Sequence, residues 1–318
     1  MGMLVDGTWF DNDPPPDRTG QFVRPDSIFR DRVTRDGASG FKAEAGRYQL
    51  VTAPSCPWAH RTVLMRKLKR LEGAIGLLES DLPKGQGWAY SRGFDELQPK
   101  DGVFHVHQVY SAARPGYTGR ATVPALWDRE RKTIVNNESS EIIRMLNSEF
   151  DEFGDAGLDL YPNELRRDID AINAFVYDNI NNGVYRCGLA KSQTAYEEAF
   201  RKLFAALDEL EARLGRQRWL VGDRFTEADL RLFPTLLRFD TVYYVLFKCN
   251  LRRLTDYHNL WNYTREIYQM PGVAETVDFP RIKQGYYGGM LHINPNGILP
   301  LGPALDFAAP HDRGRLSA

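Results

Sequence analysis

Cysteine and histidine are scarce in this chain, which has three cysteines and six histidines among its 318 residues. Three scattered cysteines cannot form the disulfide framework of a small secreted domain. No pair of histidines has the spacing of zinc ligands on a helix, so no metal site is expected.

An excess of charge of either sign is also lacking, because 41 basic residues stand against 42 acidic ones, a formal net charge of −1. A nucleic-acid binder needs a basic face, so no nucleic-acid partner is predicted. The apolar runs, such as 242–247, are far shorter than the roughly 20 residues of a membrane span, so no membrane partner is predicted. The first residues lack the basic and apolar regions of a secretory signal, and a cytoplasmic location is the expectation.

The length indicates about two domains, since domains commonly hold roughly 150 residues. Residues 1–46 are rich in Gly, Pro and Asp and predict an extended N-terminal arm. Residues 47–158 alternate short strand patterns with helical ones, whereas residues 163–318 have helical apolar spacing followed by a Gly- and Pro-rich tail. The sequence therefore predicts a mixed α/β domain, then an all-helical one, with a boundary near Leu158 to Pro162.

Cys56 is the residue that indicates chemistry. A strand is predicted at 47–51 and a helix over 60–71, with Ser55 as the N-cap and Pro57 in the first turn. Cys56 would then lie at a helix N-terminus, where unpaired N–H groups and the helix dipole favour an anion. A thiol there can lose one or more units from its ordinary pKa of about 8.5, which yields a reactive thiolate.

Two interpretations of Cys56 are open: a reactive nucleophile, which the local pattern favours, and a buried cysteine that packs as a small hydrophobe. Ala59 stands where a Cys-x-x-Cys motif would place its second sulfur. A mixed disulfide on Cys56 could not be resolved internally, so a small external thiol is predicted as cosubstrate. Cys187 and Cys249 are interpreted as structural.

Two later stretches could assist such a site. Val123-Pro124 lies in a strand-like stretch and is a candidate cis peptide, although an ordinary edge or turn proline is the simpler interpretation. Glu138 and Ser139 begin a predicted helix and could receive a ligand that carries both a carboxylate and an ammonium group, such as a γ-glutamyl group. Plain helix capping is the simpler interpretation of that pair.

Together these features resemble the glutathione transferase superfamily, and most closely its Xi class, the glutathionyl-hydroquinone reductases. The resemblance extends over about residues 40–303 and implies an α/β thioredoxin-like N-terminal domain plus an all-α helical C-terminal domain. It is carried by several motifs in the right order: 55–61 (SCPWAHR), 119–128 (GRATVPALWD), 134–146 (IVNNESSEIIRML), 182–185 (NGVY), 286–287 (YY) and 293–295 (INP).

The resemblance also implies roles for matched positions. Cys56 would be the nucleophile. Tyr185 and Tyr286 would act on the hydroquinone and line its site, with Tyr287 as a rival for the second place. The positions implied to hold glutathione are Trp88, Arg120, Val123, Glu138 and Ser139.

The implied activity is a thiol-dependent reductase that removes glutathione from glutathionyl-hydroquinones through a mixed disulfide on Cys56. No tightly bound cofactor is implied; glutathione would be the cosubstrate, with γ-glutamylcysteine or mycothiol as other possible thiols, and the partner would be a second copy in a homodimer. One alternative is a general thiol transferase or dehydroascorbate-type reductase. Another is a non-catalytic binding module on the same fold, which the intact Cys56 argues against.

The chain departs from the family pattern around the implied acceptor site. Gly285 stands where His usually precedes the paired tyrosines, and Gly289 and Met290 stand where Ser-His usually follows. Cys187 replaces a residue that is usually small. These changes bear on the substrate and on the thiol, and they leave the nucleophile in place.

Two further features are predicted to be structural. His60 is expected to pack or to form hydrogen bonds rather than to catalyse. Thr226 and Asp229 form a predicted capping box, which is a folding signal.

Overall fold

The computed structural model describes residues 2–11, 19–94, 97–98 and 102–316. Its contacts divide the chain into two compact units, and the chain passes between them several times. The first unit comprises Met1–Pro14, Asp26–Leu158 and Thr276–Leu299, and the second comprises Pro15–Pro25, Asp159–Glu275 and Pro300–Ala318. The segment 276–299 thus differs from the prediction that all of residues 163–318 form the helical part, because it packs with the first unit.

A four-stranded sheet in the order β4-β3-β8-β9 forms the centre of the first unit. Its strands are β3 (Tyr48–Thr52), β4 (Ile75–Glu79), β8 (Ala125–Asp128) and β9 (Thr133–Asn136). β3 pairs parallel to β4 and antiparallel to β8, which in turn pairs antiparallel to β9. Every residue of β3 is buried, as expected of a central strand covered on both faces.

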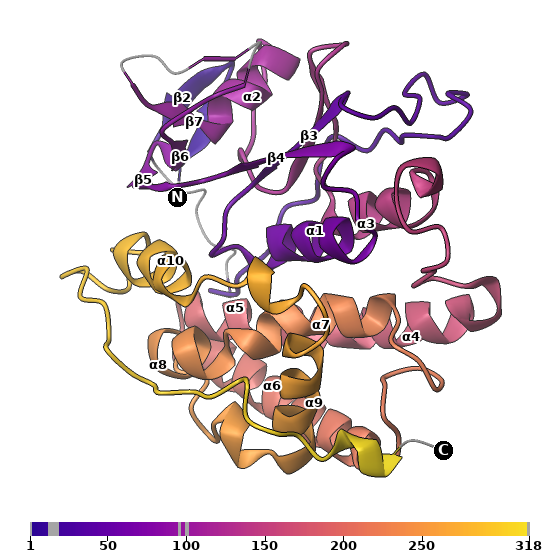
Figure 1. Ribbon diagram of the computed structural model, residues 1–318. Coiled ribbons are helices and arrows are strands. Elements are labelled where there is room, and N and C mark those ends of the chain that lie inside the picture. Colours follow the sequence, from indigo (N-terminus) through magenta and orange to yellow (C-terminus); the bar gives the residue numbers. More distant parts are fainter. Residues whose placement is uncertain (1, 12–18, 95–96, 99–101, 317–318) are drawn as a thin grey trace. The chain divides into compact units, whose positions relative to one another are not determined.

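Three helices cover this sheet: α1 (Pro57–Leu68), α2 (Val106–Ala113) and α3 (Ser139–Ser148). α1 and α3 pack side by side on one side of the β3–β4 strands, and α2 lies on the other side, where it packs against β9 (Figure 1). The predicted strand at 47–51 and the predicted helix after Cys56 are therefore present.

Short antiparallel strands extend this unit where the sequence predicts none. β1 (Met3–Val5) and β2 (Thr8–Phe10) form a hairpin within the predicted N-terminal arm. β5 (Leu82–Gly85), β6 (Gly87–Tyr90) and β7 (Phe104–His105) form a second sheet. Such strands are too short to give a pattern of period two, and their pairing with neighbours stabilises them.

The second unit is built from helices among its described residues. Its elements are η2 (Asn163–Leu165), α4 (Arg166–Val176), η3 (Tyr177–Asn181), α5 (Gly183–Gly188), α6 (Gln193–Leu214), α7 (Glu227–Leu237), η4 (Phe239–Tyr243), α8 (Tyr244–Leu246), η5 (Leu254–Asp256), α9 (His258–Tyr268) and η8 (Arg313–Leu316). In the first unit, η1 (Asp151–Phe153), α10 (Phe279–Lys283) and the π-helix η7 (Gln284–Gly288) complete the set, and η6 (Ala274–Thr276) lies where the units divide.

The predicted capping box at the start of α7 is confirmed. The backbone N–H and hydroxyl of Thr226 donate to the Asp229 carboxylate at 2.8 and 3.0 Å. The same buried carboxylate accepts from the Leu220 N–H and from the Tyr263 hydroxyl. These bonds join the start of α7 to α9 and to the loop after α6.

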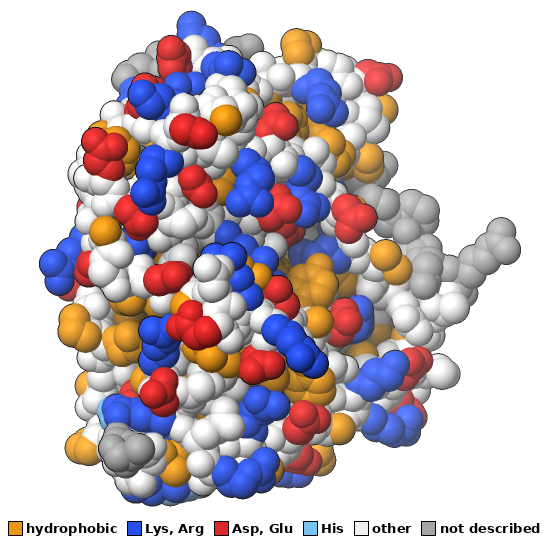
Figure 2. Space-filling model, turned by 90° about the vertical axis from the view of Figure 1, so that its right-hand side faces the viewer, with side chains coloured by type: hydrophobic (Ala, Val, Ile, Leu, Met, Phe, Trp, Pro, Cys, Tyr) orange, Lys and Arg blue, Asp and Glu red, His pale blue; other side chains and the backbone are white. Residues whose placement is uncertain are grey.

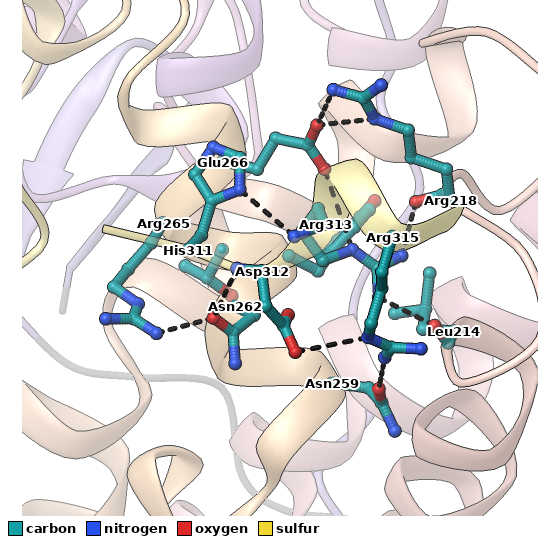
Figure 3. A network of polar contacts seen from close by, with 12 residues as sticks. Leu214, Arg218, Asn259, Asn262, Arg265, Glu266, His311, Asp312, Arg313 and Arg315 are labelled. Atoms are coloured by element: carbon teal, nitrogen blue, oxygen red, sulfur yellow. Dashed lines mark hydrogen bonds and ion pairs between the residues drawn. The ribbon is translucent and has the colours of Figure 1, made fainter. Parts of the chain in front are cut away.

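Arg313 ties the C-terminal residues to the helical unit (Figure 3). Its fully buried guanidinium donates to the carbonyls of Leu214, Gln217 and Arg218 at 2.6 to 2.9 Å. Its Nε lies 3.6 Å from the Glu266 carboxylate, which also pairs with Arg218. The carbonyls at the end of α6 therefore receive a cation, which is favourable at a helix C-terminus.

The surface agrees with the balanced composition. Figure 2 shows Lys and Arg side chains interspersed with Asp and Glu over the face it displays. Among the helices that the structure describes, none is long and apolar enough to cross a membrane.

Candidate functional site

Cys56 is the N-cap of α1, and Pro57 occupies the first helical position. The backbone of Cys56 is extended, at φ −79° and ψ 117°, and its carbonyl accepts the first helical hydrogen bond, from the N–H of His60 at 3.0 Å. The prediction of Ser55 as N-cap is therefore wrong by one residue, because Pro57 has no N–H and fixes the helical φ directly after Cys56. The correction places the sulfur itself at the helix end.

Cys56 contacts Val123, one of the residues implied to hold glutathione. Its Sγ lies 3.4 Å from the Val123 carbonyl oxygen, and the Val123-Pro124 peptide bond is cis, as the sequence suggested it could be. β8 begins at the next residue, Ala125, so Pro124 lies in the turn before a central strand. Its missing N–H therefore removes no hydrogen bond from the sheet. Two motifs separated by more than sixty residues thus meet in the first unit.

Glu138 and Ser139 lie at the start of α3, on the side of the sheet that α1 also covers. The Glu138 carboxylate accepts from the N–H and hydroxyl of Ser140, at 3.0 and 2.9 Å, and from the hydroxyl of Ser27 at 3.1 Å. Burial acts to raise the pKa of Glu138, but these hydrogen bonds and the charge of Arg61 outweigh it and hold the pKa below its ordinary value. The plain capping role is thus present, and the carboxylate stays charged.

Two residues near Glu138 were not singled out from the sequence. Arg61 is buried in α1, with its guanidinium 4.5 Å from the Trp58 ring centroid and 3.4 Å from the Ser139 hydroxyl. Ser27 comes from the predicted arm. Arg61 lies inside the motif that signals the family, whereas Ser27 has no local pattern that could have marked it.

Trp88 lies half-buried on β6 and packs against the apolar cluster that includes Cys56 and Val123. The ammonium of Lys84, on β5, lies 3.9 Å from the centroid of the Trp88 ring. Neither β5 nor β6 was expected, so the sequence analysis missed Lys84. Arg120 is half-buried three residues before Val123, and its carbonyl accepts from the Tyr117 hydroxyl at 3.0 Å.

Tyr286 and Tyr287 occupy consecutive positions of η7, and both are buried. η7 lies against the turn that holds the nucleophile, since a Cβ on Gly285 would lie 2.1 Å from the Ser55 Oγ. A residue with a side chain at 285 would therefore displace Ser55, which accounts for the glycine there. Burial raises the pKa of Tyr287 to about 12, so its hydroxyl remains a donor at neutral pH.

Tyr185 belongs to the second unit, in α5, and its place relative to Cys56 remains a prediction. Its ring is buried among Tyr243 and Phe247, with centroids 6.0 and 5.4 Å away. The guanidinium of Arg24 lies 5.0 Å from the Tyr185 centroid and donates to the Asn182 amide oxygen. Tyr185 is thus an anchored ring whose orientation neighbouring aromatics fix.

The other candidate residues have surroundings that suit a structural role. His60 is buried and shares a 2.8 Å hydrogen bond with the Thr276 hydroxyl, as expected. Cys187 and Cys249 are buried free thiols, and burial raises the pKa of Cys249 well above its usual value. Among the residues that the structure describes, no group of three or more His, Cys, Asp or Glu side chains is arranged to hold a metal ion.

Comparison with known families gives two matches. Residues 55–149 match the glutathione S-transferase N-terminal domain, and residues 193–266 match the glutathione S-transferase C-terminal domain. The first match contains Cys56, Trp88, Val123 and Glu138.

Whole-length comparisons agree with these domain matches. The chain is 47% identical over 326 residues to the glutathionyl-hydroquinone reductase YqjG of Escherichia coli, with 98% of each chain covered. It is 49% identical over 307 residues to the glutathionyl-hydroquinone reductase PcpF of Sphingobium chlorophenolicum, covering 96% of this chain and 97% of that protein.

Solved structures give the same result. The glutathione-bound structure of YqjG has a TM-score of 0.88 at 44% identity, covering 98% of this chain and 99% of that chain. A Xi-class transferase from Natrialba magadii has a TM-score of 0.89 at 44% identity, covering 100% of this chain and 98% of that chain.

Proposed function

Because this chain belongs to the Xi class of the glutathione S-transferase family, we propose that it is a glutathionyl-hydroquinone reductase that uses glutathione as its thiol. The observation that carries the proposal is the placement of Cys56 at the N-cap of α1, with its sulfur beside Val123 and with Ala59 in place of a second cysteine. A lone sulfur at a helix end is suited to a mixed disulfide that an external thiol resolves.

The reaction begins with attack of the Cys56 thiolate on the thioether sulfur of a glutathionyl-hydroquinone. The bond between that sulfur and the ring carbon breaks, its electron pair stays on the ring, and the carbon gains a proton to give the free hydroquinone. Cys56 is left in a mixed disulfide with glutathione. A second glutathione thiolate attacks this disulfide, which forms glutathione disulfide and restores the Cys56 thiolate.

The proposed binding residues form two groups, one for glutathione and one for the hydroquinone ring. Val123 offers backbone groups to the peptide part of glutathione, and the charged Glu138 with Ser139 at the start of α3 suits an ammonium and a carboxylate. We include Trp88 and Arg120 in the same set. Tyr185 and Tyr286 are proposed to donate hydrogen bonds to the phenolic oxygens while charge develops on the ring, with Tyr287 as the rival for the second place.

Cys56→Ser tests the nucleophile. The variant should lose all thiol-dependent reduction of a glutathionyl-hydroquinone while its circular dichroism spectrum stays that of the wild type, because a serine hydroxyl is not ionised at neutral pH. Cys187→Ser is the matched control and should keep the activity. More than a trace of activity in the Cys56→Ser protein would show that another group attacks the sulfur.

The identity of the thiol is tested by mass. Incubation of the reduced protein with the disulfide of glutathione, of γ-glutamylcysteine or of mycothiol should give a mixed disulfide with glutathione on the peptide that contains Cys56, because the Cys56 thiolate attacks one sulfur and the other thiolate leaves. An adduct with another thiol alone would assign that thiol in its place.

The location of the protein and its oligomeric state also belong to the proposal. We propose a cytoplasmic location, because the reaction consumes a reduced thiol and none of the three cysteines that the structure describes forms a disulfide, which suits a reducing compartment. We also propose a homodimer, which light scattering on the purified protein tests; a monomeric mass would contradict it.

A further inference from the structure

Lys84 has an unusual environment for a lysine. Its side chain is half-buried on β5, with the ammonium stacked on the face of Trp88 at a distance typical of a cation–π contact. Burial lowers the pKa of Lys84 to about 8, and the negative charge of Cys56 opposes that shift. Trp88 in turn packs against the apolar cluster that contains Cys56, so the ammonium lies next to the surroundings of the nucleophile.

The fold holds Lys84 in this place from two sides. The antiparallel pairing of β5 with β6, which aligns Leu82 with Ala89, brings Lys84 to Trp88. η7 packs against β5, and a Cβ on Gly289 would lie 2.7 Å from the Cδ of Lys84. The glycine that departs from the family pattern at 289 therefore leaves the room that the stem of Lys84 occupies.

Opposing influences set the charge state of the Cys56 sulfur. Its contact with the Val123 carbonyl oxygen favours the protonated thiol, because only S–H can donate to that oxygen. The N-terminus of α1 acts in the opposite direction, as does any cation nearby. Lys84 is a cation of this kind, since its charge and that of Cys56 act on each other.

We propose that Lys84 is a positioning residue for the reaction: its ammonium, held between Trp88 and the Gly289 turn, is the counter-charge that keeps Cys56 as a thiolate. This inference rests on the proposed function only in taking Cys56 as the nucleophile. It assigns to the unpredicted β5–β6 hairpin a direct influence on the reacting sulfur.

The tyrosines and His105 on the elements around Lys84 are neutral near pH 7, whereas Asp81, whose pKa lies below its ordinary value, carries a negative charge that acts on Tyr90. On β6, burial raises the pKa of Tyr90 well above its ordinary value, and the charge of Cys56 adds to that shift. On η7, Tyr287 keeps its proton, as described above. On β7, the His105 Nε2 lies 3.2 Å from where a Cβ on Gly85 would be, and burial lowers the pKa of His105, so this ring adds no charge. On α1, His60 is engaged with Thr276.

The test measures the reactivity of Cys56 without quinone or glutathione. The full-length protein is alkylated with iodoacetamide between pH 5 and pH 10, and the rate at Cys56 is read from the mass of its peptide. Lys84→Met keeps the stem and removes the charge. Its rate at pH 6.5 should be roughly tenfold below that of the wild type, which corresponds to a thiol pKa higher by about one unit. The rate at pH 10 should be unchanged.

Two variants complete the test. Lys84→Arg should keep the wild-type profile, because a guanidinium retains the charge, and the exposed Lys42→Met should also leave it unchanged. A Lys84→Met profile that coincides with the wild type would overturn the inference, and so would an equal loss in Lys84→Arg. A circular dichroism spectrum like that of the wild type shows that the variant is folded.

The two proposals fail separately. If the protein does not reduce glutathionyl-hydroquinones, the shift in the alkylation profile still tests Lys84.

Discussion

Tyr286 and Tyr287 are consecutive buried residues, and only chemistry on the ring can show which hydroxyl acts. We expect Tyr185→Phe and Tyr286→Phe each to slow release of the hydroquinone ring roughly tenfold to a hundredfold, the effect of losing a hydrogen bond worth on the order of 1.5–3 kcal/mol to a developing charge. Single-turnover release of hydroquinone from a glutathionyl-hydroquinone measures this rate.

The same variants should barely change attack on a small mixed disulfide, because its thiolate leaving group needs no phenolic donor. This second substrate separates the reductase from a general thiol transferase. Equal losses on both substrates would contradict the reductase assignment. A loss in Tyr287→Phe and none in Tyr286→Phe would exchange the roles of the two neighbours.

Glu138 gives a prediction with a defined pH range. Its folded-state pKa lies below the ordinary value of 4.5, so its charge stabilises the fold above pH 4.5, and this stabilisation is lost as the pH falls through the lower folded-state pKa. Glu138→Gln should therefore lower the free energy of unfolding by about 1 kcal/mol at neutral pH and by less in acid. Urea unfolding at a series of pH values measures the difference.

The exposed Glu152→Gln is the matched control for this series and should show no such trend. A Glu138→Gln deficit that grows as the pH falls would mean that the carboxylate is destabilising in the folded state.

At the scale of the single residue, the sequence predicted the reacting groups better than their surroundings. Cys56 and Val123 could be singled out because each lies in a recognisable motif, and the structure brings the two together. Lys84 and Ser27 could not, because their roles depend on contacts between segments far apart in the chain and no local spacing records such contacts.

At the scale of the elements, the buried Arg313 that anchors η8 gives a testable prediction. Arg313→Met leaves the carbonyls at the end of α6 without their cation and the Glu266 carboxylate with Arg218 alone. Breaking a buried pair of this kind costs about 3–5 kcal/mol, which thermal and urea unfolding would show as a loss of stability.

Arg315→Met serves as the comparison, because that guanidinium is 39% exposed and forms a surface pair with Asp312. Its loss should cost less than about 1 kcal/mol. Equal effects of the two substitutions would show that burial does not matter at Arg313.

The elements also show where prediction from sequence ends. The start of α7 at Thr226 was evident, because its cap residues form a recognisable capping box. The β5–β7 sheet was not, since strands of two to four residues carry no readable alternation and depend on pairing across a turn at Gly87, which has φ +79°. The predicted N-cap of α1 was wrong by one residue, because Pro57 fixes the helical φ directly after Cys56.

For the whole molecule, the return of residues 276–299 to the first unit has a consequence for its stability. A fragment of residues 1–158 lacks η7 and the Thr276 hydroxyl that pairs with His60. We expect this fragment to melt at a lower temperature alone than with a synthetic peptide of residues 276–299, as followed by circular dichroism.

A peptide of the same composition in scrambled order is the control for this experiment and should not raise the melting temperature. If the fragment melts identically with and without the true peptide, the segment is dispensable for the fold of the first unit.

The same return of the chain also sets an order of events during synthesis. The ribosome makes Cys56 early and Tyr286 near the end, more than two hundred residues later, which takes on the order of ten to fifty seconds at ordinary rates of translation. Throughout that interval the nascent chain carries its thiol without η7 against Ser55. The proposed donor to the ring joins the nucleophile only when almost the whole polypeptide has been made, so an incomplete chain released from the ribosome carries the cysteine but not the finished catalyst.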